Sequence, residues 1–292
     1  MSVIVKIKVI KLNYKLIIIV FLMMLLILST GLLIYSNASS DEENSIRLPI
    51  IMYHSLLKEE ARSGKYTVTP DTFKADLEYI SSKGYTTITM TELIDYVYNN
   101  TPLPEKPIII TFDDGYYNNF VYAIPILKEY NMKAIIAIVG EYTDRYSRSG
   151  EANANYGYMR WEDINSAMED GIIEFQNHSY NLHGNNNGRN GSMKKRGESL
   201  EEYKTFLTSD LMKLQDEFKE NTKYIPNTYT YPFGAVSKES GDIIKEMGFK
   251  ASLSCTSGIN FISRNKNCLY LLKRNNRPYN VSTEKFFKKL LE

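Results

Sequence analysis

The feature that most constrains how this 292-residue chain folds is the alternation of short apolar runs with amphipathic segments from residue 48 onward. Two of the apolar runs, Pro107–Phe112 (PIIITF) and 134–139 (AIIAIV), have the composition of strands that are buried on both faces. Such strands, alternating with helices, are typical of a parallel sheet covered by helices. Seven or eight strand–helix units in about 245 residues predict an α/β fold, a distorted (β/α) barrel of about seven strands.

Start signals place several of the helices. Thr69 before Pro70 is a cap followed by proline at the first helical position, and Thr91 is a second candidate cap. The polar segment 184–199 (GNNNGRNGSMKKRGES) predicts a mobile loop. The expected strands are 48–53, 85–89, 107–112, 134–139, 172–176, 227–231 and 250–254, and the expected helices are 70–82, 91–98, 117–130, 161–169, 200–218 and 237–247. An apolar segment at 269–273 and a helix at 283–291 close the chain.

An uncharged apolar segment precedes this domain. Residues 16–35 (LIIIVFLMMLLILSTGLLIY) are long enough to cross a hydrocarbon core of about 30 Å. The flanking charges predict a cytoplasmic N-terminus (1–15), a transmembrane anchor (16–35), a linker (36–46) and an extracellular domain (47–292). A secretory signal cleaved near Ser36-Asn37-Ala38 is the alternative. The flanking charges are Lys6, Lys8, Lys11 and Lys15 before the segment and Asp41, Glu42 and Glu43 after it.

Charge and cysteine content limit the partners. Without the four N-terminal lysines, 31 of the 35 basic residues remain against 34 acidic ones, so no basic footprint for nucleic acid is present. We expect a monomer. Cys255 and Cys268 allow either one disulfide or two buried thiols, and they do not have the spacing of a metal site.

Two adjacent carboxylates, Asp113 and Asp114, follow the strand 107–112 and precede Gly115. Desolvation and like-charge repulsion oppose ionising both at the end of an apolar strand. A metal ion bound by one carboxylate, with the other left as a base, would remove this conflict. The alternative for Asp-Asp-Gly alone is a strand-to-helix turn with an Asp cap.

Three histidines and one rigid turn follow other predicted strands. His178 and His183 come after the strand 172–176, and His54 ends the first strand. In a barrel the loops after the strands share one rim, so these imidazoles are expected to face the carboxylate pair. Two imidazoles and one carboxylate make a three-ligand set that leaves positions for water and substrate. The turn 230–234 (TYPFG) has the Pro and Gly of an irregular backbone that can aim an amide N–H at a ligand.

Together these residues resemble the polysaccharide deacetylase family, the NodB-homology group of carbohydrate esterases. The resemblance spans residues 48–291 and is strongest at Thr-Phe-Asp-Asp-Gly (111–115) and His-Ser-x-x-x-His (178–183). It implies a distorted β/α barrel that removes acetyl groups from N-acetylated sugars of chitin, peptidoglycan or exopolysaccharide. The implied roles are a general base for Asp113, metal ligands for Asp114, His178 and His183, and a backbone oxyanion donor for Phe233. Tyr231 and Pro232, beside Phe233, are candidates for substrate binding.

The chain departs from many family members at three points. Its histidines are five residues apart rather than four, Thr230 stands where many members have an Arg that orients the catalytic Asp, and no histidine follows His183. These departures resemble the branch of biofilm poly-N-acetylglucosamine deacetylases, in which an early histidine is thought to replace the missing general acid. His54 is therefore the candidate acid.

The resemblance predicts a metal-dependent hydrolase that removes N-acetyl groups from N-acetylglucosamine-containing cell-surface polysaccharide. Zn²⁺ is the expected ion for a His₂Asp set, with Co²⁺, Ni²⁺ or Fe²⁺ as other candidates. Two alternatives stay open, an O-acetyl esterase acting on xylan or wall polymer and a barrel that binds glycan without turning it over.

Overall fold

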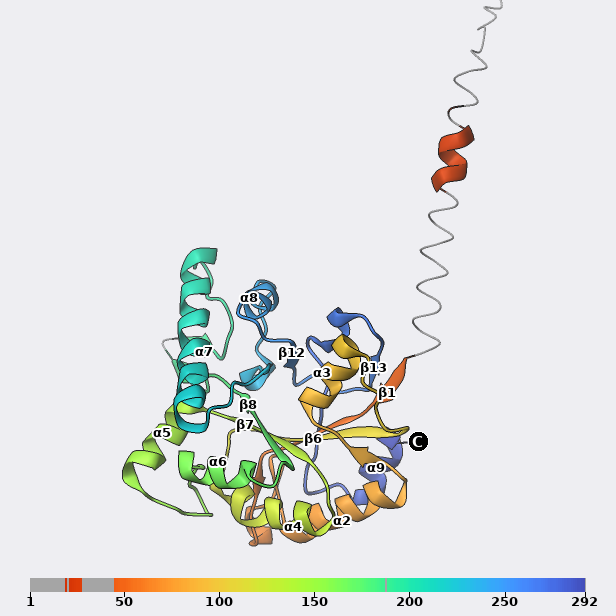
Figure 1. Cartoon of the computed structure of the whole chain (residues 1–292). Helices are drawn as coiled ribbons and strands as arrows, with labels where there is room; N and C mark the ends of the chain where they lie inside the picture. The colour runs from red at the N-terminus through yellow and green to blue at the C-terminus, as the bar shows by residue number, and fades with distance from the viewer. Residues whose placement is uncertain (1–18, 20, 28–44, 187, 292) are drawn as a thin grey trace, which may run out of the picture. The chain divides into compact units, whose positions relative to one another are not determined.

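Figure 1 shows a computed structural model that describes residues 19, 21–27, 45–186 and 188–291. The chain divides into two units, 1–45 and 46–292. The predicted cytoplasmic segment, most of the predicted anchor and most of the linker lie outside the described residues. No helix among the described residues combines the length and apolar character that a membrane span needs.

The second unit alternates strands with helices, as the sequence predicts. Its strands are β1 (Ile46–Leu48), β2 (Ile50–Tyr53), β3 (Ser55–Leu56), β4 (Thr67–Val68), β5 (Thr86–Thr87), β6 (Pro107–Phe112), β7 (Ala134–Ile138), β8 (Ile173–Asn177), β9 (Asn185–Asn186), β10 (Arg189–Asn190), β11 (Thr228–Thr230), β12 (Ala251–Leu253), β13 (Asn260–Ile262) and β14 (Asn275–Asn276). Its α-helices are α2 (Pro70–Ser82), α3 (Met90–Asn99), α4 (Ile124–Glu129), α5 (Gly140–Ser149), α6 (Trp161–Met168), α7 (Leu200–Thr222), α8 (Ser240–Glu246) and α9 (Thr283–Leu291). Shorter helical turns lie at Glu60–Arg62, Asn119–Ala123, Pro232–Gly234 and Lys266–Leu269.

The main sheet is parallel and closes on itself. Its strands follow the order β12-β11-β8-β7-β6-β2-β14, and β5 adds to the start of β6. Leu253 in β12 bridges in parallel to Leu272, just before β14, and β14 pairs with β2 at the other edge. The segment around 272–276 therefore joins the two edges, and the predicted (β/α) barrel is confirmed.

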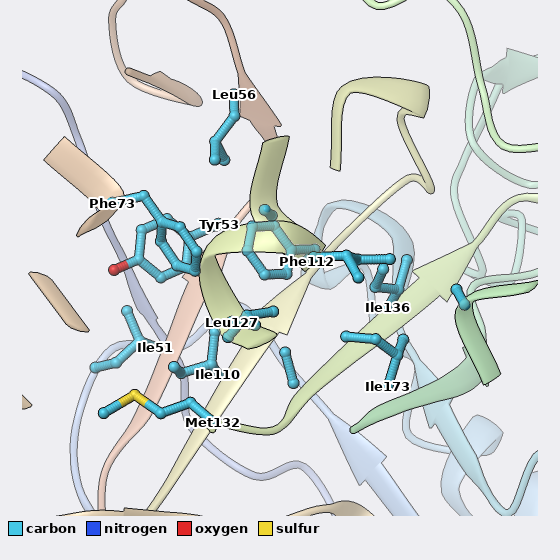
Figure 2. Packing of buried hydrophobic residues seen from close by; sticks show 14 of the residues in the cluster. Ile51, Tyr53, Leu56, Phe73, Ile110, Phe112, Leu127, Met132, Ile136 and Ile173 are labelled. Carbon is cyan, nitrogen blue, oxygen red and sulfur yellow. The ribbon is translucent and has the colours of Figure 1, made fainter. Parts of the chain in front are cut away.

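Side chains of β6 alternate between the two faces of the sheet, as strand geometry requires. Ile110 and Phe112 pack outward among the helices, where Phe112 stacks on Tyr53 at 5.3 Å and meets Phe73 edge-on at 5.4 Å (Figure 2). Ile109 belongs to a different buried cluster. Asp113 has the parity of Ile109, so this alternation directs its carboxylate to the inner face at the barrel mouth.

Helices pack in neighbouring pairs around the sheet, α2 with α9, α5 and α7 with α6, and α7 with α8 (Figure 1). The predicted Thr69 cap of α2 is confirmed, since its side chain accepts from Thr72 N at 3.1 Å. The predicted Thr91 cap of α3 is wrong. Thr89 caps this helix through a capping box with Glu92, whose carboxylate accepts from the Thr89 N–H at 2.8 Å.

Two other regions differ from the sequence-based expectation. Helix α5 was not predicted; only two of its ten residues are buried, so its sequence lacks a strong apolar stripe. The polar segment 184–199, predicted as a mobile loop, contains the strand pair β9–β10 and a buried Arg189. The Arg189 guanidinium pairs with Glu198 and lies 3.7 Å from the Phe206 ring centroid, which explains why a charged side chain is buried there. Cys255 and Cys268 are both free thiols.

Candidate active site

The carboxylate pair ends β6 in a sharp turn. Asp113 N still donates to Tyr53 O of β2, whereas Asp114 has a left-handed φ of 72° that breaks the strand geometry. Gly115 follows with φ 74°, and a Cβ built there would lie 2.8 Å from Ile138 Cγ2 of β7. The turn therefore needs glycine at this position, and it sends the two neighbouring carboxylates in different directions.

Asp114, His178 and His183 come together, as the sequence predicts. Asp114 Oδ1 lies 2.9 Å from His183 Nε2 and 3.4 Å from His178 Nε2. The ligand atoms of all three lie within 4.8 Å of one another. Among the described residues no donor meets the buried Asp114 Oδ1 in hydrogen-bond geometry. One carboxylate oxygen and two imidazole nitrogens that converge without satisfying one another fit a shared divalent cation.

The strand after the histidines sets the orientation of His178. Its Nδ1 lies 2.8 Å from the carbonyl oxygen of Thr230 at the end of β11. Because a carbonyl only accepts, Nδ1 carries the proton and Nε2 keeps its lone pair toward Asp114. His183 is half-buried, and its carbonyl accepts from the Tyr142 hydroxyl at 3.1 Å. The five-residue spacing of the two histidines is thus compatible with convergence on one point.

Asp113 does not belong to this triad. Arg274 binds it with two parallel hydrogen bonds, Nη1 to Oδ1 at 2.6 Å and Nη2 to Oδ2 at 2.8 Å. Arg274 has no exposed surface and also donates to Ser254 O at 2.8 Å and Thr111 Oγ1 at 3.2 Å. The strand register places the backbone of Arg274 level with Ile109. Its side chain therefore extends along the inside of the barrel to reach the Asp113 carboxylate.

The expectation that Asp113 lacks an orienting arginine is therefore wrong. Thr230 does occupy the usual position, but the guanidinium enters from the segment before β14 instead. One signal was present in the sequence, because Arg274 and Arg277 flank two asparagines near the end of the last β segment. Both arginines are buried and ion-paired, Arg277 with Asp76 of α2. Nothing in local sequence indicates which carboxylate each would meet.

The charges around the site keep the carboxylates ionised. Burial alone would raise the pKa of Asp113, but the charge and hydrogen bonds of Arg274, together with His178 and His54, hold this pKa below its ordinary value. Burial would also raise the pKa of Asp114. Its contacts with His178 and His183 outweigh this effect and hold the pKa of Asp114 well below its ordinary value. Burial would lower the pKa of His183, whereas Asp114 raises it, and the net direction is upward. The site therefore holds two carboxylates, one neutralised by arginine and the other matched to a cation.

His54 reaches the same rim from the end of β2. Its Nε2 lies 4.0 Å from Asp113 Oδ2, and its ring lies 4.7 Å from the Tyr66 ring. Burial lowers the pKa of His54, although Asp113 and Asp114 oppose this shift. Its buried Nδ1 has no hydrogen-bond partner among the described residues. The imidazole thus lies beside Asp113 but beyond hydrogen-bond distance, at a separation that one bridging water could span.

The turn after β11 presents Phe233 to the site but not its two predecessors. Phe233 has a left-handed φ of 57°, is half exposed and lies 4.5 Å from the His183 ring. The Tyr231 side chain is fully buried, with its hydroxyl 3.0 Å from Ser240 Oγ, and Pro232 is also buried. The predicted substrate-binding role of Tyr231 and Pro232 therefore has no accessible side chain to support it.

Three tyrosines that no sequence motif indicates cluster beside the triad, where the Tyr142 ring lies 6.4 Å from the His183 ring. Tyr158 stacks on Tyr116 at 4.9 Å and lies 4.4 Å from Tyr142. Burial and the charge of Asp114 raise the pKa of Tyr116 to about 12, so its hydroxyl stays protonated at neutral pH. These rings form an aromatic wall beside the cation site.

Comparisons with known proteins agree with this geometry. The family model for polysaccharide deacetylases matches residues 100–252, more than half of the chain. Poly-beta-1,6-N-acetyl-D-glucosamine N-deacetylase of Escherichia coli K12 is 22% identical over 227 residues, covering 72% of this chain and 34% of the relative. The enzyme of the same name from Staphylococcus aureus MSSA476 is 24% identical over 190 residues, covering 65% of this chain and 61% of the relative. The chain thus spans about a third of the length of the E. coli relative.

Two solved structures share the fold. The de-N-acetylase from Aggregatibacter actinomycetemcomitans superposes with a TM-score of 0.68 at 23% identity, covering 84% of this chain and 100% of that one. The Streptococcus pyogenes deacetylase PplD in complex with acetate gives a TM-score of 0.67 at 21% identity, covering 85% and 100%. At these identities the similarity establishes the barrel alone.

Proposed function

The chain belongs to the polysaccharide deacetylase family, and from this premise we propose that it is a metal-dependent hydrolase that removes N-acetyl groups from N-acetylglucosamine-containing cell-surface polysaccharide. One observation carries the proposal. Asp113 is held by Arg274 as an ionised carboxylate outside the cation-binding triad, and it lies beside that triad and 4.0 Å from His54. A base, a candidate acid and a cation site thus meet on one rim of the barrel.

Asp114, His178 and His183 would hold the metal ion, and Zn²⁺ suits their donor atoms, with Co²⁺, Ni²⁺ or Fe²⁺ as alternatives. When bound, the ion supplies Lewis acidity toward water and toward the acetyl carbonyl. The tautomer of His178 set by the Thr230 carbonyl keeps one imidazole lone pair available for this purpose.

Asp113 acts as the general base in this proposal. A base must be ionised at working pH, and the lowered pKa of Asp113 provides this state in spite of burial. Both of its oxygens accept from Arg274, so the carboxylate cannot rotate freely. Each oxygen keeps a second lone pair, and one of these would accept the proton of a water molecule bound beside the triad.

His54 is the proposed general acid. Its lowered pKa makes it neutral at neutral pH, so it first has to gain the proton that Asp113 takes from water. The 4.0 Å separation of Nε2 and Oδ2 is longer than a hydrogen bond, so in this proposal the proton passes through one bridging water. The resulting imidazolium would protonate the departing sugar amine, since an amide anion is a very poor leaving group. The backbone amide of Phe233 is the proposed oxyanion donor, supported by its left-handed φ and its contact with His183.

Acetate release from N-acetylglucosamine oligomers tests the base. Asp113→Asn, an isosteric change, is expected to lower kcat by about 10²–10⁴-fold at saturating Zn²⁺. Near-normal turnover by this variant would reject the mechanism.

Asp114→Ala combined with His178→Ala is expected to abolish bound metal, and stoichiometric metal in that variant would reject the ligand assignment.

An O-acetyl esterase is the second candidate, because burial disfavours the charged form of His54 and an ester leaving group needs less acid assistance. His54→Ala separates the two: a strong loss on amides with little loss on esters fits the amide reaction. Equal indifference on both substrates would remove His54 from the mechanism. The non-catalytic glycan-binding barrel is favoured by the absence of the usual arginine and of a histidine after His183, and Arg274 removes the first of these two arguments. Zinc titration with an acetate assay tests it directly.

The polymer is proposed from the relatives' names. Poly-β-1,6-N-acetylglucosamine is the first candidate because both relatives described above carry it in their names. Acetate release compared across this polymer, chitin oligomers and peptidoglycan would identify the substrate.

We also propose that residues 16–35 anchor the chain with its barrel outside the cell, or are cleaved on export. Protease accessibility of the barrel in intact cells, together with the N-terminal sequence of the mature protein, tests both forms.

A further inference from the structure

The turn that carries His178 and His183 is held from two sides by groups outside the triad. On one side lies the first turn of α5. Gly140 N donates to Ser179 O at 3.1 Å, and Glu141 N donates to Tyr180 O at 2.8 Å. These N–H groups are among those that a helix start leaves without an intrahelical acceptor. The turn and the helix start thus satisfy each other's backbone groups.

On the other side lies Asp210, in the middle of α7. Its Oδ1 accepts from Tyr180 N at 2.8 Å, and its Oδ2 accepts from Asn181 N at 2.9 Å. The two oxygens of one carboxylate therefore accept hydrogen bonds from two successive backbone amides midway between the histidines. Asp210 is half-buried, and burial raises its pKa to about 6 against the opposing effect of these two amides. Residues 178–183 belong to neither a helix nor a strand, so no regular secondary structure offers acceptors for the N–H groups of Tyr180 and Asn181.

This turn has a shape that the backbone does not adopt by itself. Ser179 has a left-handed φ of 73°. A Cβ on Gly140 would come within 2.7 Å of the Tyr180 ring, so the ring packs directly against the helix start. The turn must nevertheless bring the Nε2 atoms of two histidines to one oxygen of Asp114. Within the turn, Leu182 N donates to Ser179 Oγ at 3.1 Å, and from outside it Asp210 provides two further hydrogen bonds that hold this conformation.

We infer that Asp210 is a positioning residue that sets the metal affinity of the site through the backbone of Tyr180 and Asn181, an inference that rests on the proposed function. It touches none of the three ligands. Its carboxylate fixes the segment between His178 and His183 and so the separation of their imidazoles. Loss of a group that orients metal ligands lowers affinity by about 10–100-fold.

The test is a metal titration of the full chain, read without any activity assay. Asp210→Asn keeps the size of the side chain but turns an N–H donor toward one of the two backbone N–H groups. Its apparent Kd for Zn²⁺, measured by competition with a chromophoric chelator, is expected to rise about 10–100-fold. The d–d spectrum of bound Co²⁺ is expected to change as well. Asp216→Asn, an exposed change on the same helix, is the matched control and should leave both readouts unchanged.

Two reference variants separate this inference from the proposed function. Asp114→Ala and His183→Ala should lose the ion; if they retain it stoichiometrically, the metal site itself is wrong. If they lose it while Asp210→Asn binds Zn²⁺ with the wild-type Kd and gives the wild-type Co²⁺ spectrum, the positioning role is overturned and the metal site stands. Should Asp210→Asn not fold, Asp210→Glu replaces it. It keeps the charge but shifts the carboxylate by one methylene, and a wild-type Kd in that variant would equally overturn the inference.

Discussion

Replacing Arg274 by Met removes the guanidinium that holds Asp113 while keeping an unbranched side chain in the barrel. Both partners are buried, and two hydrogen bonds of 2.6 and 2.8 Å join them. Breaking such a pair from one side costs about 3–5 kcal/mol of folding free energy, because the remaining charge is left buried. The variant is therefore expected to be clearly less stable, and its catalytic effect has to be measured on the folded fraction.

The catalytic effect follows from the pKa of Asp113. An adjacent arginine lowers the pKa of an aspartate by about 1–3 units. Without Arg274, burial becomes the main influence and moves the pKa of Asp113 upward. The acidic limb of kcat/KM against pH, which reports the base of the free enzyme, should shift to higher pH by about 1–3 units. Lost orientation is expected to lower kcat by about 10²-fold further.

The same substitution reverses the sign of a stability effect. In the wild type the pKa of Asp113 lies below its unfolded value of about 3.9, so the pair stabilises the fold at neutral pH and this contribution is lost as the pH falls through the folded pKa. In Arg274→Met the raised pKa makes ionisation unfavourable. Stability should then fall as the pH rises through the new pKa. Urea denaturation between about pH 2 and pH 8 measures both slopes, the wild-type slope below the unfolded pKa of about 3.9 and the slope of the variant above it.

Arg277→Met is the matched control. Arg277 is as buried as Arg274 and binds Asp76 with two hydrogen bonds of 2.8 and 3.0 Å. It should cost similar stability but leave the acidic limb in place. An unshifted limb in Arg274→Met would refute the reasoning. So would an undiminished kinetic effect of Arg274→Met in an Asp113→Asn background, where no base remains to be oriented.

Three further predictions concern the scaffold and the ion. Gly115→Ala should cost roughly 1–2 kcal/mol from its positive φ, and more from the contact with Ile138, and should weaken Zn²⁺ binding; an unchanged denaturation midpoint and Kd would contradict the account of the turn. Asp76→Ala should cost about 3–5 kcal/mol, because it leaves the buried Arg277 without its carboxylate, and should change Zn²⁺ affinity little, because neither residue belongs to the triad. With free Zn²⁺ at 100 times its Kd for the protein, adding a chelator should lower the free energy of unfolding by about 2.7 kcal/mol. Equal melting temperatures with and without chelator would mean that no ion binds the native state.

The barrel and most of its elements could be predicted from sequence because their signals are local. Apolar strands, the Thr69-Pro70 helix start and the long helix α7 are each readable within a few residues. The Thr91 cap failed for a local reason too, since two threonines compete and only the capping box with Glu92 favours Thr89. Helix α5 escaped because it lies on the surface, where few of its residues need to be apolar.

The chemistry-bearing residues of the site were also visible in the sequence, because carboxylates and histidines at strand ends share one rim in a parallel barrel. Asp113, Asp114, His54, His178 and His183 all meet there. Which groups support them could not be predicted. Arg274 is far from Asp113 in sequence and reaches it only when the barrel closes, whereas Asp210 reaches the histidine turn when α7 packs beside β8. The reacting groups can therefore be recognised from local patterns, whereas the arginine that keeps Asp113 ionised and the carboxylate that holds the histidine turn are found only in the folded barrel. The physical reason is that buried charges are matched by whichever partner the closed fold brings within hydrogen-bond distance, and that distance is not encoded in any local pattern.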